Sequence, residues 1–162
     1  MKRPCPFPQG SHGAVSRVTL VALVLLPFLP LNAATLTWDA DGTAGGATGG
    51  TGTWNTSAVL WNNAGTMQAW NNLANDLALF GGTAGTVTLG SPVTVVGMTF
   101  NSSGYTIAGA GNTLTLGGSV NVTTAEHTAL INSAISFSAA TNFGGAGNLT
   151  LHVGSTVAGA NF

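Results

Sequence analysis

Short runs of alternating apolar and polar residues dominate the chain from residue 81 to residue 162. Most runs are three to five residues long, and Gly, Asn or Ser separates one run from the next. The runs cover residues 87–89, 93–95, 98–100, 105–107, 114–116, 120–122, 135–137 and 149–153. Successive side chains of a β-strand point to opposite faces, so each run predicts a strand with one buried side.

The length of these strands favours one all-β architecture over another. Strands of a sandwich or barrel commonly reach five or six residues, whereas a solenoid coil uses two or three short strands joined by frequent turns. The helix formers Lys, Glu, Arg and Gln are almost absent after residue 33, so we expect almost no helix. The pattern predicts a parallel β-helix, which is a β-solenoid, and leaves a β-sandwich as the alternative.

The composition changes at about residue 80. Residues 34–80 hold all four tryptophans, and the Gly-rich stretch at 42–52 predicts a flexible loop. We interpret residues 34–80 as a capping segment, because the first coil of a solenoid otherwise exposes apolar surface. Residues 81–162 form the short-strand segment, and we expect further coils to follow it. One motif in it, at 111–116, recurs at 147–151, about 35 residues later, without a strict repeat through the chain.

Residues 1–33 have the pattern of a cleavable signal peptide. The three basic residues of the chain precede a fourteen-residue apolar run, Val18 to Leu31, and small residues follow that run. The run is shorter than the roughly 20 apolar residues that span a bilayer core, which argues against a membrane anchor. We expect cleavage after Ala33 or Ala34, and an exported chain with no integral membrane span after signal removal.

Charge limits the partners of the exported part. It contains no Lys or Arg, because all three basic residues lie in the first 17 positions. Basic side chains supply most non-specific affinity for nucleic acids and for anionic membranes, so we expect neither partner. The single cysteine, Cys5, would be removed with the signal peptide, so the exported part would have no disulfide.

Four acidic residues are candidates for acid–base or metal chemistry: Asp39, Asp41, Asp76 and Glu126. The first two precede Gly42 as in a calcium loop, but the other acidic ligands of such a loop are missing. A glycosidase needs two carboxylates on either side of a sugar, and polysaccharide-active β-helix enzymes also use Lys or Arg. We therefore predict no catalytic residue, no metal ligand and no cofactor, and keep such an enzyme as a distant third hypothesis.

The tryptophans form the pattern that is most typical of ligand binding. Indole rings on a β surface can stack on sugars, and nearby amide groups can bind sugar hydroxyl groups. This hypothesis predicts a carbohydrate site made of Trp54, Trp61, Trp70, Asn62 and Asn71, with Asn63 and Asn72 beside them. The other interpretation, which we favour, places the same indoles over the apolar end of the solenoid.

Six segments follow one another in a recognisable order. They are Trp38-Asp39, Trp54-Asn55, Trp61-Asn62-Asn63, residues 75–80, residues 95–101 and Tyr105-Thr106-Ile107. In this order they resemble the N-terminal region of bacterial autotransporter passenger proteins with autotransporter-associated β-strand repeats, over nearly all of residues 35–151. The resemblance implies a right-handed parallel β-helix outside a Gram-negative-type cell. The chain departs from the family pattern in two places, because an expected Asn-x-Tyr-x-Gly turn is missing and no translocating barrel precedes Phe162.

The sequence thus predicts a secreted or cell-surface protein that acts as a non-catalytic structural or adhesin-like passenger. Its location would be outside the cell or in association with the outer membrane. Its partners would be host or matrix glycans, or other chains that pair with open strand edges. A carbohydrate-binding module that uses the Trp-rich surface is the alternative.

Overall fold

A computed structural model describes residues 1–3, 33–152 and 157–158. The predicted signal peptide, residues 1–33, lies almost entirely outside the described residues. The described residues form strands and no helix, so none of their segments is a helix that could cross a membrane.

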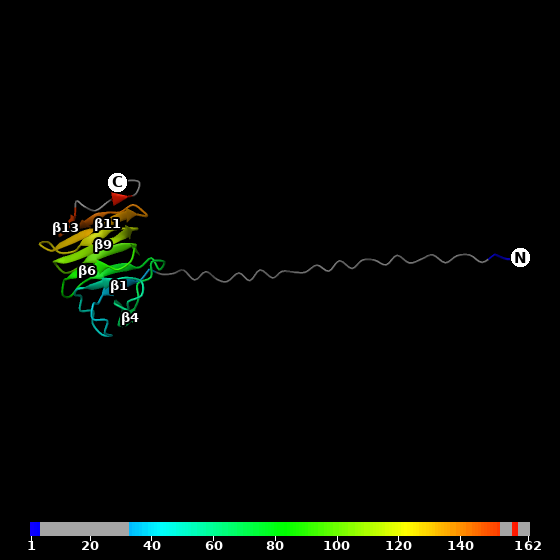
Figure 1. Cartoon of the computed structure of the whole chain (residues 1–162), viewed down its shortest axis with the longest axis horizontal. Coiled ribbons are helices and arrows are strands. Elements are labelled where there is room, and N and C mark those ends of the chain that lie inside the picture. The colour runs from blue at the N-terminus through cyan, green and yellow to red at the C-terminus, as the bar shows by residue number, and fades with distance from the viewer. Residues whose placement is uncertain (4–32, 153–156, 159–162) are drawn as a thin grey trace.

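Three columns of short parallel strands build a solenoid of about four turns (Figure 1). The first column contains β1 (Thr35–Trp38), β5 (Leu77–Phe80), β8 (Gly97–Phe100), β10 (Val120–Val122) and β12 (Phe143–Gly145). The second contains β2 (Gly52–Trp54), β6 (Thr86–Leu89), the first parts of β9 (Tyr105–Leu116) and β11 (Thr128–Phe137), and β13 (Asn148–Leu151). The third contains β7 (Val93–Val95), the second parts of β9 and β11, and β14 (Val157–Ala158). The predicted parallel β-helix is confirmed, and the β-sandwich alternative is wrong.

The coils are related by a strand register that the sequence motif does not follow. Ala78, Met98, Val120 and Phe143 are partners in successive coils, so each of these three coils takes 20 to 23 residues. The two copies of the sequence motif lie in different columns. The copy at 111–116 leads into the third column, and the copy at 147–151 lies in the second column. The motif therefore does not mark the length of a coil.

The core lies inside the coils and consists of the inward positions of each strand. Val87, Ile107 and Ile131 are stacked in the second column, and all three are fully buried. In the first column the rings of Phe80 and Phe100 are stacked, with centroids 5.0 Å apart and an angle of 17° between the planes. Burial of this apolar surface is the main favourable contribution to folding.

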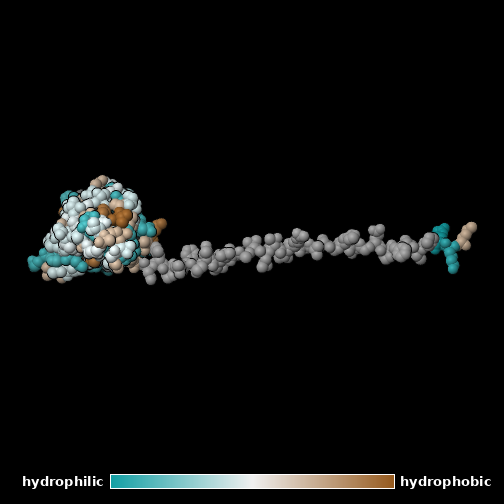
Figure 2. Space-filling model, turned by 90° about the horizontal axis from the view of Figure 1, so that it is seen from below, coloured by the Kyte–Doolittle hydropathy of each residue, from teal (hydrophilic) through white to brown (hydrophobic). Residues whose placement is uncertain are grey.

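A β-hairpin covers the outer edge of the first column. Its strands are β3 (Trp61–Asn63) and β4 (Thr66–Gln68), and β3 pairs with β1 in the antiparallel direction. The turn between them has φ of 48° at Ala64 and 95° at Gly65, which is typical of a two-residue hairpin turn. The hairpin lies at the lower end of the solenoid in Figure 1. Figure 2 views the molecule from that side, where the surface is mostly intermediate in hydropathy and hydrophobic atoms gather near its centre.

The Gly-rich stretch is more ordered than the sequence predicts. Gly49 is buried and forms β-bridges with Asp39 and with Thr83, which belong to different coils. The backbone N–H of Gly50 also donates to the carbonyl oxygen of Thr83 at 2.6 Å. The prediction of a flexible loop at 42–52 is therefore wrong for the end of this stretch, which leads directly into β2.

Candidate functional site

The four tryptophans lie together inside the solenoid. Trp38, Trp54 and Trp61 are fully buried, and Trp70 is 2% exposed. Trp61 is at the centre of the cluster, because its ring centroid lies 5.2, 4.8 and 4.7 Å from those of the other three. Edge-to-face and tilted contacts of this kind stabilise aromatic clusters in protein cores. The structure thus places these indoles where a sugar ring cannot stack on them.

Hydrogen bonds fix the orientation of two of these indoles. The Trp38 Nε1–H donates to the carbonyl oxygen of Gly50 at 2.8 Å, and the Trp70 Nε1–H donates to that of Thr94 at 3.0 Å. The indole nitrogens of Trp54 and Trp61 are buried and have no hydrogen-bond partner among the described residues. Packing of the large ring surfaces therefore dominates at these two positions.

The asparagines of the predicted carbohydrate site bind the protein backbone. Asn62 is 6% exposed, its Oδ1 accepts the N–H of Gly65 at 2.7 Å, and its Nδ2 donates to the Gly45 carbonyl oxygen at 3.2 Å. The exposed Asn71 accepts the N–H of Leu73 through its Oδ1 at 3.0 Å. These amides therefore shape the hairpin turn and a nearby loop. The structure brings Trp54, Trp61 and Trp70 of the predicted site together, but in the core. It does not place Asn62 and Asn71 beside an exposed indole.

Asp39 and Asp41 share the hydroxyl group of Thr48. Its Oγ1 lies 2.9 Å from Asp39 Oδ1 and 3.1 Å from Asp41 Oδ2. Asp41 Oδ1 also accepts hydrogen bonds from the Thr43 hydroxyl and backbone N–H, and these bonds lower the pKa of the Asp41 carboxyl group. No group of three or more His, Cys, Asp and Glu side chains lies together within the described ranges. These hydrogen bonds show that Asp39 and Asp41 stabilise the turn that contains them.

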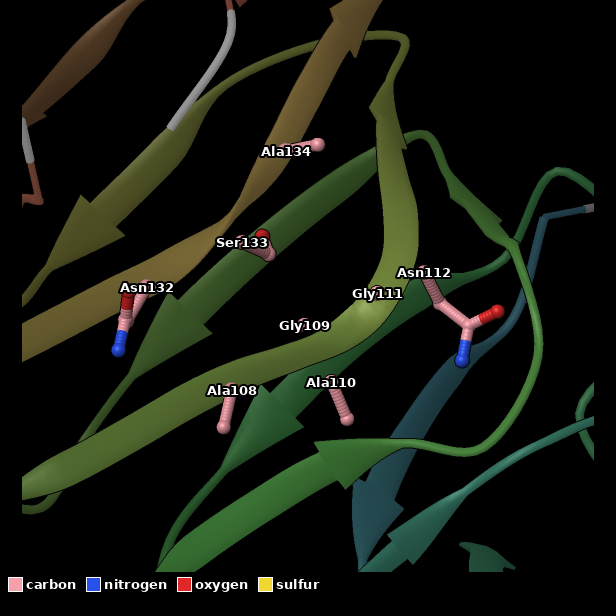
Figure 3. Close-up of a pocket in the computed structure, with 8 residues that line it drawn as sticks. All are labelled: Ala108, Gly109, Ala110, Gly111, Asn112, Asn132, Ser133 and Ala134. Carbon is pink, nitrogen blue, oxygen red and sulfur yellow. The ribbon is translucent and has the colours of Figure 1, made fainter. Parts of the chain in front are cut away.

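A hollow of about 320 Å³ opens where β9 and β11 separate (Figure 3). It is lined by Ala108–Asn112 of β9 and Asn132–Ala134 of β11, and we call it the β9–β11 hollow. The two strands pair at Ala108 and Asn132 and again at Thr113 and Ala134, so four residues of β9 face one residue of β11. The extra residues of β9 bend outward and create the hollow.

The sequence analysis did not select the residues of the β9–β11 hollow. The available signal is the run Gly109-Ala110-Gly111, which interrupts the apolar and polar alternation of β9. A side chain at Gly109 would lie 2.8 Å from the Cα atom of Ser133, so the close contact with β11 requires a glycine. A one-dimensional pattern does not reveal which residue of the next coil lies opposite such an interruption.

A second hollow, of about 250 Å³, lies on the outer surface between β9, β11 and β13. It is lined by residues 104–106, residues 128–130 and Thr150. The hydroxyl groups of Ser103 and Thr128 lie 3.3 Å apart near it. Threonine hydroxyl groups supply the polar side chains at the surface of this hollow. Its only ionisable lining residue in the described part of the chain is Tyr105, which is buried.

The last strands of the first two columns form the other end of the described solenoid. These strands are β12 and β13, and both stand at the end of their sheets among the described residues. Phe143 in β12 is 42% exposed, whereas its partner in the preceding coil, Val120, is fully buried. Apolar surface and unpaired backbone groups at such an end favour pairing with a further strand.

The architecture defines a parallel β-solenoid with an aromatic cluster at one end and few charges. Neither a protein-family model nor a solved structure matches the chain. The chain is similar to the "Adhesin BmaC autotransporter" of Brucella suis biovar 1 (strain 1330), with 44% identity over 153 residues. The match covers 90% of this chain and 4% of that protein, so the chain spans only a small part of its relative. The predicted resemblance to autotransporter passenger proteins is confirmed.

Proposed function

We propose that this protein is a secreted or cell-surface, non-catalytic passenger that acts as an adhesin-like scaffold. The observation that carries the proposal is the 44% identity to a segment of an autotransporter adhesin. The parallel solenoid supports it, because stacked coils present their outward side chains at regular intervals over an extended surface.

The chemistry of the surface agrees with a role in attachment to neutral partners. No Lys or Arg occurs after position 17, and only four Asp and Glu residues are present in the chain. Outward positions instead carry many hydroxyl groups, as at Thr86 and Thr106, which are partners in adjacent coils. Host or matrix glycans present complementary hydroxyl groups, so they are the partners that we propose.

An attachment assay tests the proposal. Beads coated with the full chain are expected to remain on host cells or on extracellular matrix after washing. Beads coated with an unrelated β-rich protein of similar net charge serve as the control. Equal retention of the two kinds of bead would contradict the adhesive function.

Export is a second part of the proposal, and it depends on residues 1–33 as a signal peptide. Expression of the full chain in a Gram-negative cell should yield an exported product that begins at Ala34 or Thr35. Mass spectrometry of the product measures this terminus directly. A cytoplasmic product that keeps Lys2 and Arg3 would refute the signal-peptide assignment.

We also propose that the end formed by β12 and β13 pairs with another strand, from a further coil or from a second chain. Exposed Phe143 and the absence of Lys and Arg from the described residues 33–152 support this role, because charged side chains normally protect strand edges. Replacement Phe143→Lys should reduce self-association in sedimentation experiments. The control Leu73→Lys places the same charge at a different exposed hydrophobic residue. Equal association of both variants would argue against pairing at this end.

A further inference from the structure

We propose that the β9–β11 hollow binds a single residue of an uncharged sugar. This inference rests on the proposed adhesive function and assigns a particular site to it. Four features carry the inference: the size of the hollow, its lack of charge, the free amide of Asn132 and the conformation of the bent segment of β9.

The size of the hollow limits the ligand. Small-molecule sites in proteins commonly have volumes of roughly 300 to 1,000 Å³. The β9–β11 hollow, at about 320 Å³, is at the small end of that range and suits one sugar residue. It lies on the outer surface, since Ala110 and Asn132 in its lining are both exposed.

The lining excludes a charged ligand and favours a hydroxylated one. It contains alanine methyl groups, glycine backbone, two asparagine amides and one serine hydroxyl, and no ionisable side chain. A carboxylate or ammonium ion would lose its hydration there without gaining an opposite charge. Sugar hydroxyl groups can donate to and accept from amides, while the C–H groups of the ring can contact methyl groups.

The two asparagines are placed on opposite sides of the break in pairing. Asn112 Nδ2 donates to the carbonyl oxygen of Leu89 at 2.8 Å, which fixes the amide and leaves its Oδ1 without a partner among the described residues. The side chain of Asn132 has no hydrogen bond to any described residue. Figure 3 shows Asn132 on the same side of the strands as Ala108 and Ala110. The same view shows the Asn112 amide on the other side of the β9 bend, where it points away from Asn132. A ligand in the hollow could therefore bind the free amide of Asn132.

The backbone of β9 in this region is held in an unusual conformation. Ala110 and Gly111 have φ of 46° and 87°, and such a value is uncommon for an alanine. Residues 109–112 pair neither with β11 in the next coil nor with the strands of the preceding coil. Pairing of β9 with β6 ends at Ala108, and its pairing with β7 begins at Leu114. Ser133 is 5% exposed, and its hydroxyl group has no partner among the described residues. Backbone strain and unsatisfied polar groups often mark binding sites.

Saturation-transfer NMR with the full chain tests the proposal. The probes are the methyl glycosides of glucose, galactose, mannose and N-acetylglucosamine, with glucuronic acid as the charged comparison. At least one uncharged glycoside should bind saturably, and Asn132→Ala should weaken its binding about tenfold through the loss of hydrogen bonds.

The control is Asn121→Ala, which removes an amide from the outward face of β10 and lies outside the hollow. This variant should bind the glycoside as the unmodified chain does. The proposal is overturned if no uncharged glycoside binds at about 10 mM, if glucuronic acid binds better, or if Asn132→Ala binds as well as the unmodified chain. Far-ultraviolet circular dichroism confirms that each variant is folded.

The bead assay separates this proposal from the general function. If beads with the Asn132→Ala variant attach as well as unmodified beads, the adhesive function stands and the hollow is not its site. If the unmodified chain binds a glycoside in the hollow but its beads do not attach to cells or matrix, the sugar site stands and the adhesive function fails.

Discussion

The hydroxyl group of Tyr105 occupies the space that a side chain at Gly49 would require. The two residues are far apart in the sequence and belong to different coils. The tyrosine hydroxyl also lies 2.7 Å from the carbonyl oxygen of Gly81 and 2.9 Å from that of Thr83. One phenol group thus connects the Gly-rich stretch to the turn that follows β5.

Replacement Gly49→Ala should destabilise the fold by about 2 kcal/mol or more. The φ of Gly49 is 76°, and the new methyl group would overlap Tyr105 and two backbone carbonyl groups. Gly46→Ala is the matched control, because a methyl group there meets no atom within 4 Å. Chemical denaturation should give a change within about 0.5 kcal/mol for the control. Equal stability of the two variants would contradict the described contact.

The ionisation of Tyr105 provides a test that needs no variant. Burial raises the pKa of its hydroxyl group above the usual value of about 10. The neutral form is therefore favoured in the folded state, so its contribution to stability is present below pH 10 and is lost as the pH rises through the raised pKa. Tyr105 is the only tyrosine in the chain, so tyrosinate absorbance reports this residue alone.

The expected alkaline titration has a midpoint above 10 in the folded protein and returns to about 10 in denaturant. The variant Tyr105→Phe should show no tyrosinate signal. A midpoint near 10 in both states would mean that the hydroxyl group is exposed to solvent.

Replacement Trp61→Ala should destabilise the protein by about 3 to 5 kcal/mol, because it leaves a cavity at the centre of the aromatic cluster. Leu73→Ala is the control, since Leu73 is 82% exposed and should contribute little. Thermal unfolding measures both effects. In the unmodified chain the tryptophan emission should be blue-shifted and poorly quenched by acrylamide, whereas efficient quenching would place the indoles at the surface.

Asp41 should make the turn that contains it sensitive to acid. Hydrogen bonds from the Thr43 hydroxyl group, and then from the Thr43 backbone N–H, lower the pKa of this carboxyl group. Because the folded-state pKa is lowered, the contribution to stability is present above pH of about 4 and is lost as the pH falls through the folded-state value. Asp41→Asn should reduce the change in stability across this range.

Unfolding midpoints measured between neutral and acid pH check this prediction. The control Glu126→Gln removes an exposed carboxyl group that has no side-chain hydrogen bond to a described residue. An identical acid dependence for Asp41→Asn and the unmodified chain would show that Asp41 does not contribute.

The sequence was most informative where structure depends on near neighbours. The alternation at 87–89 and 105–107 predicted strands, and the inward residues Val87 and Ile107 are buried as that alternation requires. The tryptophans illustrate the opposite case. An indole can serve a core or a binding surface, and only packing against other coils places Trp54 inside.

The candidate sugar site could not be derived from the sequence. Ala108 and Asn132 lie 24 positions apart, and their contact depends on how many residues each coil uses to turn a corner. The flexible-loop prediction for 42–52 was wrong at Gly49 for a similar reason. Local composition shows a glycine that permits many conformations, but the partner that fixes one of them comes from another coil.

The sequence by itself determined the all-β class, the inward and outward faces of the strands, and the near absence of charge after residue 17. These properties follow from the two-residue period of a strand and from composition, which are local. The tertiary structure decided the length of a coil, the covering of β1 by the hairpin and the opening between β9 and β11. These features arise from register between coils, which depends on contacts between residues distant in the chain.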